Sequence, residues 1–443
     1  MRRIVLILLL MFAAATGAAQ QPVARGPNVV LIITDDVGYG DIGSYGAPDI
    51  KTPNIDRLAK EGVRLTDFYA NAPVCTPTRA GLLTGRYQQR VSLERPLGGV
   101  RDRDSGLPVT GRSLPQLLKN NGYATALIGK WHLGWRPEHS PNAHGFDYFF
   151  GFLSGLIDFY THTGTNGEPD LFENTTPVQE NGYMTDLITA RSVRFIEQNA
   201  SRPFFLEVAY NAAHWPFQIP DHYSVAANKA AFQGPADQKP ATRDDYVKML
   251  ERADRGVGDI LKTLEARSLA SNTLVIFTND NGGEWLSRNA PLFHRKDTLW
   301  EGGIRVPAIL RWPGRLPAGK TSSQVGMTMD LTASILAATG TRVTADARLE
   351  GMDLLPSLAG SVPPVERTLF WRNAASPGRL QRAVRRGNWK LLIDGDDLLL
   401  FELSRDIGER NDLAMTRPDL VADMRRRILE WEKDVDAESK KTN

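Results

Sequence analysis

Short runs of mainly apolar residues, separated by longer amphipathic segments, set the limits on how this chain can fold. Runs without polar alternation are typical of strands buried on both faces, as in parallel sheets covered by helices. Between them, Asp244–Ala266 and Met329–Ala338 repeat apolar residues at helical spacing, and Gly340 follows the second segment as a helix stop. The pattern predicts an α/β fold with a large, central, mostly parallel sheet flanked by helices, including strands at Val29–Ile33, Ala124–Ile128, Phe204–Ala209 and Leu274–Thr278.

The pattern changes after residues 341–365, which are rich in Gly, Pro and Ala. Short strand-like runs with a Gly-Asp turn follow, and Pro418–Val435 has the periodicity of a helix. We therefore predict a large domain at residues 26–345 and a smaller α+β subdomain at 360–443. The subdomain is expected to hold a terminal helix and a short antiparallel sheet with strands at Ala383–Arg385, Trp389–Ile393 and Leu398–Leu403.

The first residues have the three parts of a secretory signal peptide. Arg2 and Arg3 precede the apolar run Ile4–Ala15, which is followed by small residues up to Ala19. A run of about a dozen residues is shorter than the ~20 that span a bilayer. We therefore expect a cleaved leader at residues 1–19 rather than an uncleaved anchor, and a mature protein that is periplasmic or secreted, without a stable membrane anchor.

Charge and cysteine content exclude several classes of protein. Lys and Arg number 53 against 51 Asp and Glu, a net charge of +2. Proteins that bind nucleic acid concentrate an excess of cations, so no nucleic-acid partner is expected. The single cysteine, Cys75, excludes an intrachain disulfide framework and a cysteine-based zinc or iron–sulfur site.

Polar side chains follow all four predicted strands of the large sheet. Ligands of open α/β sheets bind at the carboxyl ends of the strands, so these groups are expected to converge. Three carboxylates and one amide among them offer hard oxygen ligands, which suit Ca²⁺ or Mg²⁺ and not zinc. The alternative is that the paired acids are surface caps. The groups are Asp35-Asp36, Lys130-Trp131-His132, His214 and Asp280-Asn281.

Cys75 precedes Pro77 and a series of helix-compatible residues, which places the thiol near a helix N-terminus. The N–H groups and dipole of a helix start stabilise negative charge, so the thiol pKa is expected to be lowered. The residue is then a nucleophile near a histidine. The alternative is a small buried apolar residue, and the spacing by itself leaves the two open.

The segment from Cys75 to Arg86 reads Cys-Thr-Pro-Thr-Arg-Ala-Gly-Leu-Leu-Thr-Gly-Arg and resembles the signature of the type I sulfatases, relatives of alkaline phosphatase. In that family this cysteine is oxidised to Cα-formylglycine, an aldehyde. The other family motifs occur in order along nearly the whole mature chain. The segments of this chain that resemble them are Asn28–Asp36, Gly129–Gly134, Asn279–Gly283, Lys296–Pro307 and Val384–Leu391.

The resemblance implies an alkaline-phosphatase-like fold, with 26–345 as the catalytic sulfatase domain, and a site with one Ca²⁺ per chain. It implies that residue 75, as hydrated formylglycine, is the nucleophile and also approaches the metal. Lys296 has the family's distance to Glu301, whereas its neighbour Arg295 is the ambiguous candidate. The implied metal ligands are Asp35, Asp36, Cys75, Asp280 and Asn281, and the implied catalytic residues are Cys75, Arg79, Lys130, His132, His214 and Lys296.

The chain looks most like the arylsulfatase and N-acetylgalactosamine-6-sulfatase branch. The implied function is an exported sulfatase acting on sulfated carbohydrate or aryl sulfate, matured by a formylglycine-generating enzyme. Two alternatives stay open: a phosphate or phosphonate monoester hydrolase on the same scaffold, and a non-catalytic glycan-binding homologue. Candidates for stacking on the substrate lie in or beside the motif loops: Trp131, Trp135, Tyr160, Trp215, Trp285 and Trp300.

Overall fold

The computed structural model describes residues 26–99, 101–222, 241–374 and 380–442. The predicted leader, residues 1–19, lies outside these described residues. In the described part of the chain, no helix is both long and apolar enough to cross a membrane.

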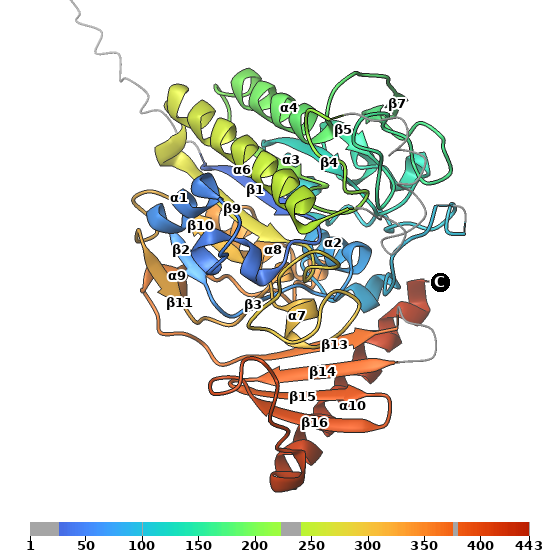
Figure 1. Ribbon diagram of the computed structural model, residues 1–443, viewed down its shortest axis with the longest axis vertical. Coiled ribbons are helices and arrows are strands. Elements are labelled where there is room, and N and C mark those ends of the chain that lie inside the picture. Colours follow the sequence, from blue (N-terminus) through green and yellow to red (C-terminus); the bar gives the residue numbers. More distant parts are fainter. Residues whose placement is uncertain (1–25, 100, 223–240, 375–379, 443) are drawn as a thin grey trace, which may run out of the picture.

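A large mixed sheet forms the centre of the molecule (Figure 1). Its five central strands, in the order β9-β1-β8-β4-β5, are all parallel, and antiparallel pairing occurs only towards its edges. The four predicted strands are confirmed as β1, β4, β8 and β9. In sheet order the strands are β11 (Lys320–Ser322), β2 (Val63–Leu65), β10 (Ala308–Arg311), β9 (Thr273–Asn279), β1 (Asn28–Thr34), β8 (Phe204–Ala209), β4 (Ala124–Lys130), β5 (Tyr148–Phe152), β6 (Phe172–Glu173) and β7 (Thr176–Pro177).

Helices cover both faces of this sheet because its central strands are apolar on both sides. Val30 and Ile32 of β1 pack into one core, and Val29 and Leu31 pack into a second core on the opposite face. The predicted helices are confirmed as α6 and α8. The first core holds α1 (Pro53–Glu61), α4 (Met184–Gln198) and α6 (Arg243–Ala266), and the second holds α2 (Cys75–Thr84), α3 (Leu114–Asn120) and α8 (Thr328–Ala338).

A separate antiparallel sheet follows near the C-terminus, with a long helix packed on it (Figure 1). The predicted strands and terminal helix are confirmed, but the first strand was not predicted. Its apolar run, Leu369–Trp371, is short and lies between Thr368 and Arg372, and its residues alternate between half-buried and buried. The elements are β13 (Thr368–Asn373), β14 (Gln381–Arg386), β15 (Trp389–Asp394), β16 (Asp397–Glu402) and α10 (Pro418–Thr442).

A third apolar core joins the C-terminal sheet to the larger part of the molecule. Tyr69 and Leu299 from the larger part pack with Trp371, Leu392 and Phe401 from the C-terminal strands. Among the remaining short elements are α7 (Glu301–Ile304) between β9 and β10, α9 (Leu355–Ala359), and β12 (Gly326–Met327), which pairs with β3 (Phe68–Tyr69) in a separate two-stranded sheet.

Candidate active site

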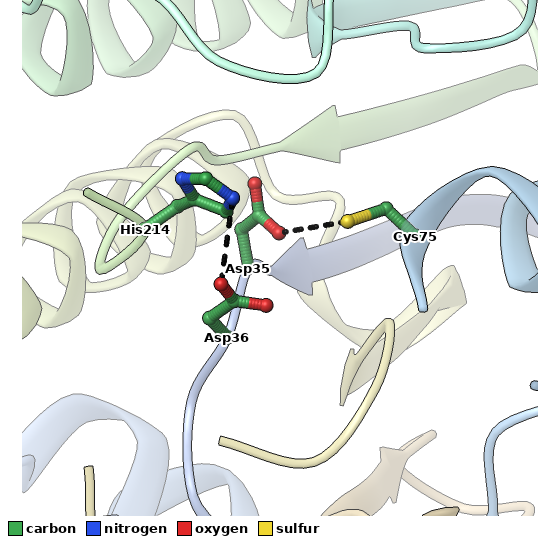
Figure 2. Close-up of side chains that lie close together, drawn as sticks. All are labelled: Asp35, Asp36, Cys75 and His214. Carbon is green, nitrogen blue, oxygen red and sulfur yellow. Dashed lines mark hydrogen bonds and ion pairs between the residues drawn. The ribbon is translucent and has the colours of Figure 1, made fainter. Parts of the chain in front are cut away.

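Side chains from separate strand ends converge beside the start of α2 (Figure 2). Asp35 and Asp36 follow β1 directly, His214 comes from the loop after β8, and Cys75 is the first residue of α2. Their potential ligand atoms all lie within 4.8 Å of one another, and all four residues are buried. The predicted convergence of strand ends is therefore present in the fold, because parallel strands bring their carboxyl ends to one edge.

Asp280 and Asn281 follow β9, and in each side chain one terminal atom makes hydrogen bonds while the Oδ1 atom makes none to the described residues. Asp280 Oδ2 accepts hydrogen bonds from Arg79 Nη2 at 2.9 Å and from Arg79 Nε at 3.1 Å. Asn281 Nδ2 donates to Asp36 Oδ1 at 2.7 Å. Among the described residues, no group hydrogen-bonds to the buried Oδ1 of either side chain. Two oriented, buried oxygens without a partner are what a cation site provides.

The acidic groups repel one another in this buried place. Burial raises the pKa of Asp35 to about 8, and the charge of Asp280 adds to the rise against the opposing effect of Lys130. Burial also raises the pKa of Asp36, but Lys296 and His214 lower it more, so that it lies well below its usual range. The cluster of carboxyl and amide oxygens fits a hard divalent cation such as Ca²⁺, whose charge offsets this repulsion.

Cys75 is buried at the helix start, as expected, but the expected lowering of its pKa is wrong. Burial raises the pKa of the thiol well above its usual range, and Asp280 and Asp35 oppose the lowering by Lys130 and Lys296. The helix N-terminus cannot compensate for complete removal from water. A thiol in this environment is a poor source of thiolate.

Cationic side chains surround the same point. Lys130 Nζ at the end of β4 lies 2.6 Å from Asp35 Oδ2, and Lys296 Nζ lies 2.7 Å from Asp36 Oδ2. Arg79, one turn along α2, is 2% exposed. The ambiguity between neighbouring cations is resolved by geometry, since Lys296 is buried at the cluster and Arg295 is exposed. Each of the three cations is paired with one carboxylate of the cluster, Arg79 with Asp280 and the two lysines with Asp35 and Asp36.

Both predicted histidines are buried, and burial lowers the pKa of each, which favours the neutral ring. His132 Nε2 lies 3.1 Å from the carbonyl oxygen of Leu97, which assigns the proton to Nε2. Its Nδ1 is buried and has no hydrogen-bond partner among the described residues. His214 Nε2 lies 3.4 Å from both Lys296 Nζ and Asp36 Oδ2.

A pocket of about 720 Å³ opens above these groups and is lined by Cys75, His132, His214 and Lys296. Of the aromatic candidates, Trp135 and Trp215 line it, whereas Trp131 is buried against Phe146. The lining also includes charged residues that the sequence analysis did not name, among them Arg103, Glu284 and Asp297.

Glu284 directly follows the motif Asn279–Gly283, and Asp297 directly follows Lys296. This closeness in sequence to predicted segments was the signal that could have identified them. Glu284 Oε2 lies 3.7 Å from Lys296 Nζ. Burial raises the pKa of Glu284 to about 7, against the opposing effect of Lys296. One wall of the pocket beside the cations is therefore lined by carboxyl groups.

The large, mostly parallel sheet with a pocket at its strand ends is an alkaline-phosphatase-like fold. The model of the sulfatase family matches residues 27–341. The chain therefore belongs to the sulfatase family, and it is a sulfuric ester hydrolase.

Individual relatives agree with this assignment. N-acetylgalactosamine-6-sulfatase from Canis lupus familiaris is 35% identical over 409 residues, covering 87% of this chain and 74% of that protein. Arylsulfatase A from Homo sapiens is 32% identical over 456 residues, covering 91% of this chain and 86% of that protein. The crystal structure of Ps i-CgsB in complex with k-i-k-neocarrahexaose has a TM-score of 0.83 and 33% identity, covering 92% of this chain and 93% of that one.

Proposed function

We propose that this sulfatase removes sulfate from sulfated carbohydrates, using one Ca²⁺ and a formylglycine made from Cys75. The observation that carries the proposal is the arrangement around Cys75. Three buried cations and the free oxygens of Asp280 and Asn281 surround this residue at the floor of a pocket large enough for a sugar. The raised thiol pKa supports conversion of the residue over use of the thiol itself.

Asp35, Asp36, Asp280 and Asn281, together with residue 75, would hold the ion through oxygen atoms. When bound, Ca²⁺ supplies positive charge that polarises the sulfate group. The formylglycine, as its hydrate, supplies a hydroxyl nucleophile at residue 75.

Arg79, Lys130 and Lys296 bind the sulfate oxygens and stabilise the charge that develops as the S–O bond breaks. His214 Nδ1 faces the carbonyl oxygen of Trp215, so the neutral ring carries its proton there and not on Nε2. The negative charge of a bound sulfate favours the protonated ring, so that Nε2, 3.4 Å from Lys296 Nζ, can take up a proton and pass it to the leaving alcohol oxygen. His132 Nδ1 is free to accept a proton from residue 75, because its Nε2 is held by the carbonyl of Leu97. The two histidines therefore act at different steps.

Two observations support a carbohydrate substrate. Trp135 and Trp215 line the pocket and offer faces on which a sugar ring can stack. The relatives at 33–35% identity include an N-acetylgalactosamine-6-sulfatase and a protein solved in complex with k-i-k-neocarrahexaose. Aryl sulfates carry the same ester and are suitable assay substrates.

The proposal also includes export and maturation. Residues 1–19 have the composition of a cleaved leader, so the mature enzyme is periplasmic or secreted without a stable membrane anchor. A formylglycine-generating enzyme acts on the segment that begins at Cys75. The catalytic domain spans 26–345 and the C-terminal subdomain 360–443, with the two sheets of the fold falling on either side of the proposed boundary.

The first test compares a sulfate and a phosphate ester of the same phenol. We expect kcat/KM to be larger for the sulfate, and chelation of Ca²⁺ to remove the activity. A larger kcat/KM for the phosphate would favour the phosphate or phosphonate hydrolase alternative. Sugar binding that survives chelation, without sulfate release from any ester, would favour the non-catalytic alternative.

A second test concerns His214. Replacement by alanine removes the proton donor, so the loss of kcat should be about 10²-fold or more for a sugar sulfate and much smaller for an activated phenyl sulfate. His162→Ala is the matched control, because His162 is also a buried histidine but hydrogen-bonds to Gly182 beside a neighbouring pocket. Equal slowing of both substrates in His214→Ala would contradict the role.

A further inference from the structure

The C-terminal sheet holds the chain segment that carries Lys296, residues 293–304, which we call the lysine segment. Gln381 Oε1 on β14 accepts a hydrogen bond from the backbone N–H of Leu299 at 2.9 Å. Asn373 Nδ2 on β13 donates to the carbonyl oxygen of Asp297 at 2.7 Å. Both contacts are made to backbone groups within three residues of Lys296, so they act on its main chain and not on its side chain.

A buried ionic cluster fixes the end of the lysine segment. Lys390 Nζ on β15 lies 2.9 Å from Glu301 Oε1 and 2.8 Å from Glu409 Oε1. Glu409 Oε2 also accepts a hydrogen bond from the backbone N–H of Glu301 at 2.6 Å. The side chains of all three residues are 0% exposed in these pairs. One buried lysine thus bridges two carboxylates, and its removal would break both ion pairs.

The other oxygen of Glu301 is held from the side of the large sheet. Glu301 Oε2 accepts hydrogen bonds from Tyr69 at 2.7 Å and from Arg305 at 3.0 Å. The carboxylate of Glu301 therefore binds residues from both parts of the molecule, and these contacts restrict the backbone at residue 301.

The opposite side of the lysine segment contacts the loop that follows β9. The backbone N–H of Lys296 donates to the carbonyl of Gly283 at 3.1 Å, and that of Gly282 donates to the carbonyl of Gly303 at 2.9 Å. This loop begins with Asp280 and Asn281. The lysine segment is thus packed between the C-terminal sheet and the loop that bears the proposed metal ligands.

We propose that Lys390 and Gln381 are positioning residues for Lys296, and that the C-terminal sheet sets where the Lys296 ammonium stands in the sulfate pocket. The inference rests on the proposed function, because it takes Lys296 as a sulfate-binding group. A lysine side chain is long and flexible, so its useful positions depend on where its backbone is anchored. A displacement of about 1 Å at such an anchor can cost about 10²-fold in rate.

The test is a double-mutant cycle measured as kcat/KM with an aryl sulfate. Lys390→Met and Gln381→Met are each made in the wild type and in Lys296→Ala. Each single variant is expected to lose about 10- to 100-fold in the wild type. Each is expected to lose less than about threefold in Lys296→Ala, because effects that pass through one group are not additive. Gln381→Met leaves the ionic cluster intact and carries the test if Lys390→Met does not fold.

Arg311→Met is the control for a general loss of stability. Arg311 of β10 is a buried cation paired with Glu61 of α1 at 2.7 Å, and its loss should lower Tm while keeping kcat/KM within about twofold. Losses that multiply in the double variants, or folded single variants with wild-type kcat/KM, overturn the positioning role. Wild-type kcat/KM in Lys296→Ala itself overturns the proposed role of Lys296, and with it this inference.

Discussion

Replacing Cys75 with alanine should lower kcat/KM for sulfate esters by about 10⁴-fold or more while the fold is kept. The substitution removes the nucleophile and any route to formylglycine. The side chain is small and buried, so alanine leaves only a minor cavity beside α2. Steady-state kinetics together with Tm separate the loss of chemistry from a loss of folding.

The stronger form of this prediction uses the wild-type protein. Conversion of cysteine to formylglycine makes the peptide that contains residue 75 lighter by about 18 Da in its aldehyde form, through loss of the thiol. Specific activity should therefore rise in proportion to the converted fraction across preparations. Cys75→Ser is the matched control, because serine offers a hydroxyl group but lacks the thiol that is oxidised. Full activity in a preparation where residue 75 is entirely unmodified would contradict the assignment.

Asp280→Asn should lose bound Ca²⁺ and lower kcat by roughly 10³-fold, since the ion supplies several kcal/mol of charge stabilisation. The amide keeps the shape of the carboxyl group but removes its charge. It also weakens the pairing that orients Arg79, whose Nη2 lies 2.9 Å from Asp280 Oδ2. Calcium content by elemental analysis and kcat with an aryl sulfate are the two measurements.

Asp254→Asn is the matched control for Asp280→Asn. Asp254 is equally buried, at 1% exposure, but accepts hydrogen bonds from Asn54 and Ile55 at the start of α1. This variant should keep both Ca²⁺ and kcat even if Tm falls. Added Ca²⁺ should raise Tm of the wild type but not of Asp280→Asn, because a ligand stabilises only the state that binds it. Near-normal kcat in Asp280→Asn without bound Ca²⁺ would show that the metal assignment is wrong.

The sequence was enough to predict four of the five central parallel strands and the convergence of polar groups at their ends. A strand buried on both faces must be apolar throughout, so β1, β4, β8 and β9 stand out from their surroundings, and the polar residues that end them mark one edge of the sheet. The motif around Cys75 added the family. These signals are local in the chain, which is why they could be found without a structure.

Tertiary structure decided the features that depend on distant neighbours. A pKa reflects all charges and burial around a group, so only the fold shows that burial, with Asp35 and Asp280 nearby, raises that of Cys75. Strand β13 was missed because its alternating pattern gains meaning only once one face packs on the shared core. The fold also shows that Lys296, which the spacing to Glu301 favoured, is buried, whereas its neighbour Arg295 is exposed.

The contacts between the C-terminal sheet and the lysine segment illustrate the same limit. Lys390 and Glu301 are 89 residues apart, and Gln381 and Leu299 are 82 apart. Nothing in the local pattern of either stretch pairs them, because a buried ion pair is specified by packing and not by spacing along the chain. The sequence determined which chemical groups the site contains. The packing of the C-terminal sheet against the larger part of the molecule determined the positions of those groups.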